Sequence, residues 1–155
     1  MPPHYLLIPL IAIGVALAGS LITRSGLGWF RTLRLPAWMP STRLITSVWT
    51  ILFILASASA ILAWNATAPR GQGELGALYL VNAFLNIAFS YLFFVRHQMG
   101  SATLEALLLS ISIGVLMLQV FSASFVAALL LAPYLLWVLF SAALAFAVFR
   151  LNVKA

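Results

Sequence analysis

The chain has 155 residues, of which 65% are hydrophobic and only 6% are charged, and its mean hydropathy is +1.15. A water-soluble domain could not cover such a composition with polar surface, so the sequence predicts an all-α integral membrane protein. Cysteine is absent, which excludes disulfides and thiolate metal sites. The net charge of +6 does not indicate nucleic-acid binding, because the basic residues stand in short segments between apolar runs, as they do in membrane proteins.

Several apolar runs are each long enough to cross a bilayer as a helix, which takes roughly 20 residues. In chain order they are residues 5–23, 44–64, 75–95, 102–120 and 125–149. Basic residues follow the first run instead of preceding it, so we expect a retained span and not a cleaved signal peptide. The polar residues 65–74 predict a loop in water. The expected architecture is a single domain, residues 1–155, built as a bundle of five transmembrane helices.

One segment does not fit a hydrophobic helix. Residues 29–49 read WFRTLRLPAWMPSTRLITSVW and hold three of the five tryptophans. Pro36 and Pro40 fix φ and lack an N–H, which indicates a stiff, non-helical stretch. We expect residues 24–43 to form a lid over a cavity that opens toward the inner side of the membrane, the side on which the first loop and the C-terminus lie.

The distribution of Lys and Arg predicts the orientation. Seven of these residues fall in the first loop, the third loop or the C-terminal segment, and only Arg70 falls on the other side. The positive-inside rule therefore places the first loop and the C-terminus inside and the N-terminus outside. The seven are Arg24, Arg31, Arg34, Arg43, Arg96, Arg150 and Lys154.

Some polar and aromatic side chains inside the spans are candidate site residues. Asn82 and Asn86 are four residues apart, so they share one face of the third helix, and that face should point into the bundle. Their amides would serve either interhelical hydrogen bonding or ligand contact. Trp49 and Trp137 lie away from the interfacial belts where Trp collects, and they would either pack in the core or stack against a flat partner.

Charged residues allow two interpretations. Arg31, Arg34 and Arg43 would either set the topology or attract the carboxylates of an amphipathic ligand. Glu105 is the sole acid within a span, and we expect it near Arg96 and His97 across the preceding turn. Motifs for hydrolysis, phosphoryl transfer and metal binding are missing, so no catalytic group or metal is predicted.

The chain also resembles a known family. The residues that match its W-x3-L-x2-P-x-W-x-P…W-T signature are Trp29, Leu33, Pro36, Trp38, Pro40, Trp49 and Thr50. Asn86 with Phe93 and Phe94, then Pro133, Tyr134 and Trp137, and finally Arg150 and Asn152 are similar to further motifs in its third and fifth spans. The family is TspO/MBR, that of the tryptophan-rich sensory proteins and the translocator protein. This chain departs from it at Phe53, Phe89 and Ala145, where Tyr, Trp and Asn are common.

The resemblance implies a membrane receptor or translocator that binds a tetrapyrrole, porphyrin or haem, in an aromatic pocket inside the bundle. It also implies light-dependent oxidative degradation of the porphyrin, a homodimer, and no required cofactor. The expected ligand-binding residues are Trp29, Trp38, Trp49, Phe53, Asn82, Asn86, Phe89, Tyr134 and Trp137. Two alternatives stay open: a structural or regulatory protein whose pocket is filled by Phe53, Phe89 and other side chains, and a transporter of amphipathic metabolites.

Overall fold

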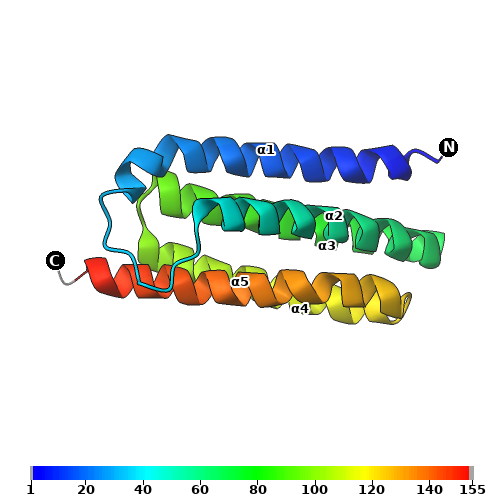
Figure 1. The fold of residues 1–155 in the computed structure, drawn as a ribbon. Coiled ribbons are helices and arrows are strands. Elements are labelled where there is room, and N and C mark those ends of the chain that lie inside the picture. The colour runs from blue at the N-terminus through cyan, green and yellow to red at the C-terminus, as the bar shows by residue number, and fades with distance from the viewer. Residues whose placement is uncertain (1, 154–155) are drawn as a thin grey trace.

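The computed structural model describes residues 2–153 and is built from long helices (Figure 1). Their bounds are α1 His4–Phe30, α2 Thr42–Ala66, α3 Pro69–Ser90, α4 Met99–Phe121 and α5 Phe125–Asn152, and the π-helix η1, Tyr91–Val95, continues α3. All five of the long helices are long and apolar enough to cross a membrane. The predicted five-helix membrane bundle is therefore confirmed.

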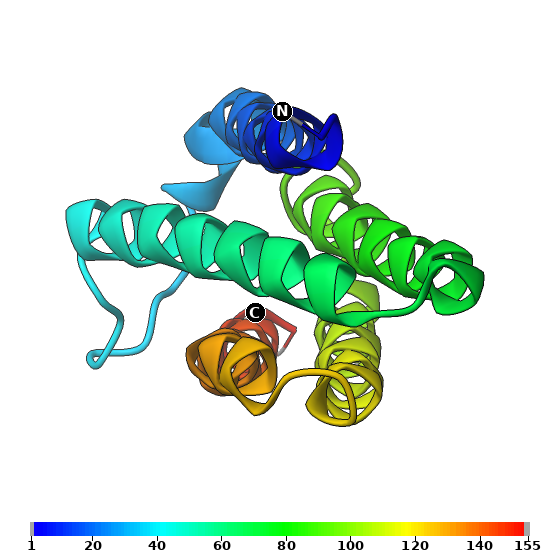
Figure 2. The ribbon, with the colours of Figure 1, turned by 90° about the vertical axis from the view of Figure 1, so that its right-hand side faces the viewer.

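The helices form three tiers (Figures 1 and 2). Helix α1 lies on one side, α2 and α3 lie in the middle, and α4 and α5 form the opposite side. The α4–α5 interface is the most extensive, while α2 packs on α5 and α3 packs on α4. Helices α2 and α3 make few contacts with each other. Helix α1 packs against both of them and covers the space between them.

The apolar core lies between the middle tier and the α4–α5 pair. On α4, Leu109, Ile113 and Leu116 are buried at helical spacing, and they belong to one cluster with Leu131 and Val138 of α5. Helix α1 is different, because Val15 and Gly26 are its only buried residues among those described. Its packing energy is correspondingly small, since hydrophobic stabilisation follows the buried apolar area.

The first helix is longer than predicted. Helix α1 continues to Phe30, so residues 24–30, which were expected to begin the lid, are helical. The extra turns are stabilised because Trp29 lies edge-on to Phe93, at 5.8 Å between ring centroids, and Phe30 lies 5.6 Å from Phe94. At the other end of the segment, Ser41 caps α2 by accepting a hydrogen bond from Leu44 N–H at 3.3 Å. Only residues 31–41 are therefore non-helical.

The loop expected at residues 65–74 is also mostly helical. Helix α2 ends at Ala66 and α3 begins at Pro69, which occupies the first turn, where its missing N–H costs nothing. The turn between them is closed by side chains: Thr67 Oγ1 donates to Ala63 O at 2.7 Å, and Gln72 Nε2 donates to Trp64 O at 3.2 Å. Polar composition here reflects capping and not a long loop.

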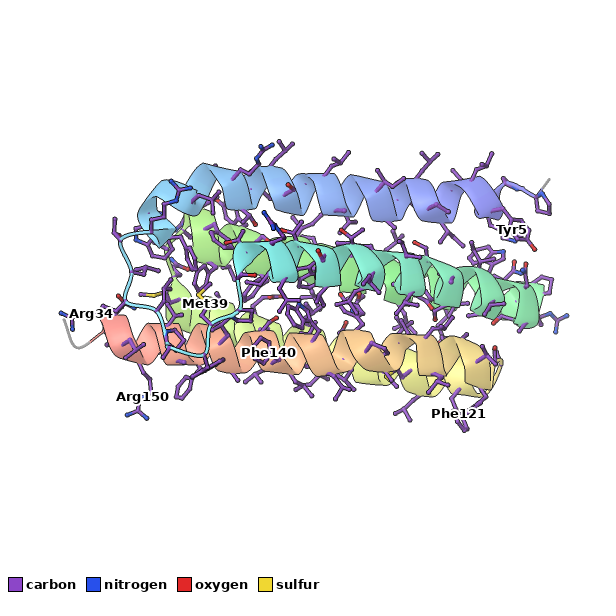
Figure 3. All side chains as sticks on the ribbon, viewed as in Figure 1. Tyr5, Arg34, Met39, Phe121, Phe140 and Arg150 are labelled. Atoms are coloured by element: carbon purple, nitrogen blue, oxygen red, sulfur yellow. The ribbon has the colours of Figure 1, made fainter. Side chains whose placement is uncertain are left out.

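Residues 31–41 run along the side of α5 (Figure 3). The backbone of Arg34 is hydrogen-bonded to the Asn152 amide, with Arg34 N–H donating to Oδ1 at 3.0 Å and Nδ2 donating to Arg34 O at 2.9 Å. Trp38 packs edge-on against Phe140, with 5.8 Å between ring centroids, and remains 52% exposed. The segment thus lies against α5 and does not reach between α1 and the middle tier.

Helix α1 touches η1 most closely at Gly26. A Cβ built there would lie 2.2 Å from Phe94 O, so the two backbones meet at a distance that only glycine permits. The π-helical turn itself is closed by Arg96 N–H, which donates to Tyr91 O at 3.0 Å. The chain then turns at His97, whose φ of 55° is left-handed.

Candidate functional site

A cavity of about 410 Å³ lies between α1, α2 and α3. It extends from Asn86 and Tyr134, which are buried in the middle of the bundle, to Pro3, which is exposed at the end of the bundle that holds the N-terminus. We call this the amino-terminal end, and the opposite end, where α5 finishes, the carboxy-terminal end (Figure 1). The volume falls within the range of small-molecule sites.

The two long walls of the cavity differ in chemistry. The α2 wall is aromatic, with Trp49 and Phe53 one turn apart, at 5.8 Å between ring centroids, and Trp64 nearer the amino-terminal end. The α1 wall is aliphatic apart from His4 and follows one helix face. Its lining residues on α1 are His4, Leu7, Ile8, Ile11, Ala12 and Val15. An aromatic wall facing an aliphatic one suits a flat, apolar molecule.

A chain of hydrogen bonds forms the buried floor of the cavity. Asn86 Nδ2 donates to Tyr134 Oη at 3.1 Å, Tyr134 Oη donates to Asn82 Oδ1 at 3.0 Å, and Asn82 Nδ2 donates to Ser112 Oγ at 2.9 Å. These residues join α3, α5 and α4. The interhelical role expected for the two Asn amides is therefore present, and both residues also line the cavity. This relay positions Asn86 rigidly.

At the amino-terminal end, a second set of polar contacts joins α1 to the last turn of α2. His4 Nε2 lies 2.8 Å from Asn65 Oδ1, and Asn65 Nδ2 donates to Tyr5 Oη at 2.9 Å. The His4 ring also packs on Trp64, with 6.0 Å between ring centroids. Tyr5 marks this end in Figure 3. These contacts attach the start of α1, which has little buried surface of its own.

The structure brings together five of the nine predicted ligand-binding residues as lining of the cavity: Trp49, Phe53, Asn82, Asn86 and Tyr134. The other four lie elsewhere. Trp29 and Phe89 pack on Phe93 near the carboxy-terminal end, Trp38 lies on the outside of α5, and Trp137 faces a shallow groove between α2 and α5.

The expected cap is wrong. Within the described part of the chain, no residue of 24–43 lines the cavity, because that segment is drawn along α5 by Asn152 and Phe140. Arg31, Arg34 and Arg43 are exposed and lie outside the cavity. The described cations predicted to lie inside do gather at the carboxy-terminal end, whereas Lys154 lies outside the described residues; the orientation itself stays a prediction.

Glu105 does not have the surroundings that were expected. It is buried, 6% exposed, and neither carboxyl oxygen has a hydrogen-bond partner among the described residues, so no hydrogen bond to Arg96 or His97 forms. His97 instead stacks on Trp29, with 4.0 Å between ring centroids. Helix α4 turns Glu105 into the bundle together with Ala102 and Ala106, and so away from the exposed loop 96–98.

His4, Tyr79 and Trp64 also line the cavity and were not predicted from the sequence. His4 could have been predicted, because it stands in helical register with Leu7 and Ile8 on the helix face that lines the cavity. Tyr79 could not, since its hydroxyl group is held by Ser59 Oγ at 2.9 Å, a contact made between two helices. Among the described residues there is no group of three or more His, Cys, Asp or Glu side chains that could hold a metal ion.

The fold and the cavity define a multi-pass membrane protein with a small-molecule-sized site between its helices. The sequence model of the TspO/MBR family matches residues 6–151. The chain belongs to the TspO/MBR family, as its resemblance to the signature had indicated.

Named relatives are found in bacteria and in animals. The chain is 36% identical to the "Uncharacterized membrane protein YtaB" of Bacillus subtilis, over 81% of each chain. It is 33% identical to the "Tryptophan-rich protein TspO" of Chlorobaculum tepidum, over 92% of this chain and 91% of that one. It is 30% identical to the human "Translocator protein", over 91% of this chain and 85% of that one. The similarity thus covers nearly the whole bundle.

Proposed function

We propose that the cavity between α1, α2 and α3 binds a tetrapyrrole, either porphyrin or haem. The observation that carries the proposal is the aromatic wall, where Trp49 and Phe53 face an aliphatic helix across a space of about 410 Å³. A planar macrocycle would gain stacking on one side and dispersion contacts on the other. Family membership supports the ligand class through the resemblance given above.

The alternative of a structural or regulatory protein without a ligand has less support. In that alternative Phe53, Phe89 and other side chains would fill the pocket. Phe53 lines the cavity without filling it, and Phe89 packs against Phe93, with 6.0 Å between ring centroids, outside the cavity. The cavity thus keeps its volume with both phenylalanines in place, which favours binding.

The test is a titration with protoporphyrin IX in detergent, followed by the porphyrin's own Soret absorbance so that replacing an indole does not change the readout. Ala83→Phe would put a ring into the cavity from α3 without removing a contact, and Ala77→Phe makes the same change on the exposed face of α3. We expect saturable binding that weakens at least tenfold in Ala83→Phe and is unchanged in Ala77→Phe. A response that never saturates, or that treats both variants alike, would exclude this site.

Trp49→Phe and Trp137→Phe form a second matched pair, because only Trp49 lines the cavity. Trp49→Phe should weaken binding and Trp137→Phe should not.

Light-dependent degradation stays a prediction. Trp49 would be the indole in contact with an excited ligand, so loss of the Soret band under light and oxygen should slow in Trp49→Phe. Homodimer formation also stays a prediction, checked by the mass of the protein in detergent.

A further inference from the structure

We infer that His4 recognises the carboxyl group of the cavity's ligand, so that the ligand binds with its acidic edge at the amino-terminal end and its apolar body along Trp49 and Phe53. The inference rests on the proposed function and adds an orientation and a specificity-determining residue to it. It also replaces the arginines of the first loop as the expected partners of the carboxyl groups.

The rest of the cavity offers no charged partner for an acid. Apart from His4, the walls on α1 and α2 are aliphatic or aromatic except at Ser57, whose hydroxyl group already donates to Phe53 O at 2.8 Å. The Tyr79 hydroxyl group on α3 is paired with Ser59 Oγ at 2.9 Å, so an ionised carboxylate in these parts of the cavity would lose its hydration and gain no charged partner. At the floor, the hydroxyl group of Tyr134 is shared between Asn82 and Asn86, in the middle of the bundle, where burying a charge is most costly. Of the lining residues that the structure describes, His4 alone has a basic side chain.

The contacts of His4 leave one ring nitrogen available. Asn65 Nδ2 donates to Tyr5 Oη, which turns Asn65 Oδ1 toward the imidazole, so Nε2 is the nitrogen that carries a proton and donates. Nδ1 has no hydrogen-bond partner among the described residues. It can share a proton with a carboxyl group, giving a charge-assisted hydrogen bond.

The ring of His4 is also fixed in its plane. It packs on Tyr5, with 4.5 Å between ring centroids, and on Trp64 at 6.0 Å. Trp64 is the aromatic residue of the α2 wall that lies nearest the amino-terminal end, so a planar ligand along that wall would bring its edge to His4. A side chain held in this way loses little entropy when it binds.

The experiment compares protoporphyrin IX with its dimethyl ester, which has the same macrocycle and no free carboxyl group. Both are titrated at one fixed pH into the native protein, His4→Phe, His4→Gln and Arg43→Gln. His4→Gln keeps an N–H donor for Asn65 but lacks the second ring nitrogen. We expect the native protein to prefer the diacid by about tenfold, as one hydrogen bond to a charged group would give.

Both His4 variants should lose that preference by weakening the diacid alone, and Arg43→Gln should keep it. Equal affinity of the native protein for acid and ester would overturn the inference, and so would a preference that depends on Arg43 and survives in His4→Gln. In either case saturable binding would leave the proposed function standing. Failure of both porphyrins to saturate the native protein would overturn the proposed function and the orientation together.

Discussion

The side-chain amide of Asn152 pairs with the backbone of Arg34 through both of its polar atoms, at 3.0 and 2.9 Å. Nδ2 also donates to Val148 O, at 2.8 Å, which holds the side chain against its own helix. One residue in the last turn of α5 therefore fixes the path of the non-helical segment between α1 and α2. The segment lies on α5 because of this pairing and because Trp38 contacts Phe140.

Asn152→Ala should release residues 31–41. Losing two hydrogen bonds of about 1 kcal/mol each would raise the population of the undocked segment more than tenfold. Trypsin should then cleave faster after Arg31 and Arg34 in the detergent-solubilised protein, because cleavage follows the open population. Asn65→Ala, at the other end of the bundle, is the control and should leave these cleavage rates alone. Unchanged cleavage in Asn152→Ala would show that Trp38 alone docks the segment.

Gly26→Ala should destabilise the bundle by about 1 to 3 kcal/mol, because the added Cβ would overlap the carbonyl oxygen of Phe94 and push α1 away from η1. Gly28→Ala is the matched control in the same helix, since a Cβ there meets nothing within 4 Å. It should be neutral or stabilising by up to about 1 kcal/mol through helix propensity. Thermal unfolding in detergent measures both. Equal midpoints would mean that α1 is not held at Gly26.

Tyr134→Phe should lower the free energy of unfolding by about 1 kcal/mol, because it removes the hydroxyl group that links Asn82 and Asn86. The loss is small because hydrogen bonds within membrane proteins contribute modestly to stability. Tyr91→Phe is the control, since that side chain is 44% exposed. A double-mutant cycle with Asn82→Ala isolates the coupling. Additive effects of Tyr134→Phe and Asn82→Ala would argue against a relay.

Glu105→Met should stabilise the protein by about 1 to 3 kcal/mol, because it removes two buried oxygens that have no hydrogen-bond partner in the described part of the chain and keeps a side chain of similar length. Glu74→Met, at an exposed position of α3, should change stability by less than about 0.5 kcal/mol. Chemical unfolding of the three proteins in mixed micelles gives the comparison. A loss of stability in Glu105→Met would reveal a favourable interaction of the carboxyl group.

Hydrophobic run length predicted the five spans, because each must cross the bilayer, but it did not predict where the helices end. Trp29 and Phe30 extend α1 because they find Phe93 and Phe94 on a distant turn of the chain. Pro69 looked like a loop residue and instead starts α3. Helix ends depend on caps and tertiary contacts, and composition does not record these.

The candidate site was likewise predicted only in part. The spacing of Asn82 and Asn86 predicted a shared inward face, and the structure shows one. Their partner Tyr134 comes from a helix 48 residues away from Asn86 in sequence, a relationship that no local pattern holds. The sequence also did not predict that the non-helical residues 31–41 lie along α5 and outside the cavity, because the contacts of Arg34 with Asn152 and of Trp38 with Phe140 join residues far apart in the chain.

Helix α1 forms one wall of the cavity while Leu6, Leu10, Leu17 and Leu21 on its other faces are exposed to lipid. The wall is thus a partition one helix thick, with acyl chains on its far side. Its apolar run, residues 5–23, spans roughly 28 Å as a helix, close to the roughly 30 Å of a hydrocarbon core, so a thicker or thinner bilayer would have to be met by a change in tilt or by local deformation of the lipid. Membrane thickness therefore becomes a determinant of cavity shape, and we expect ligand affinity to vary with acyl-chain length.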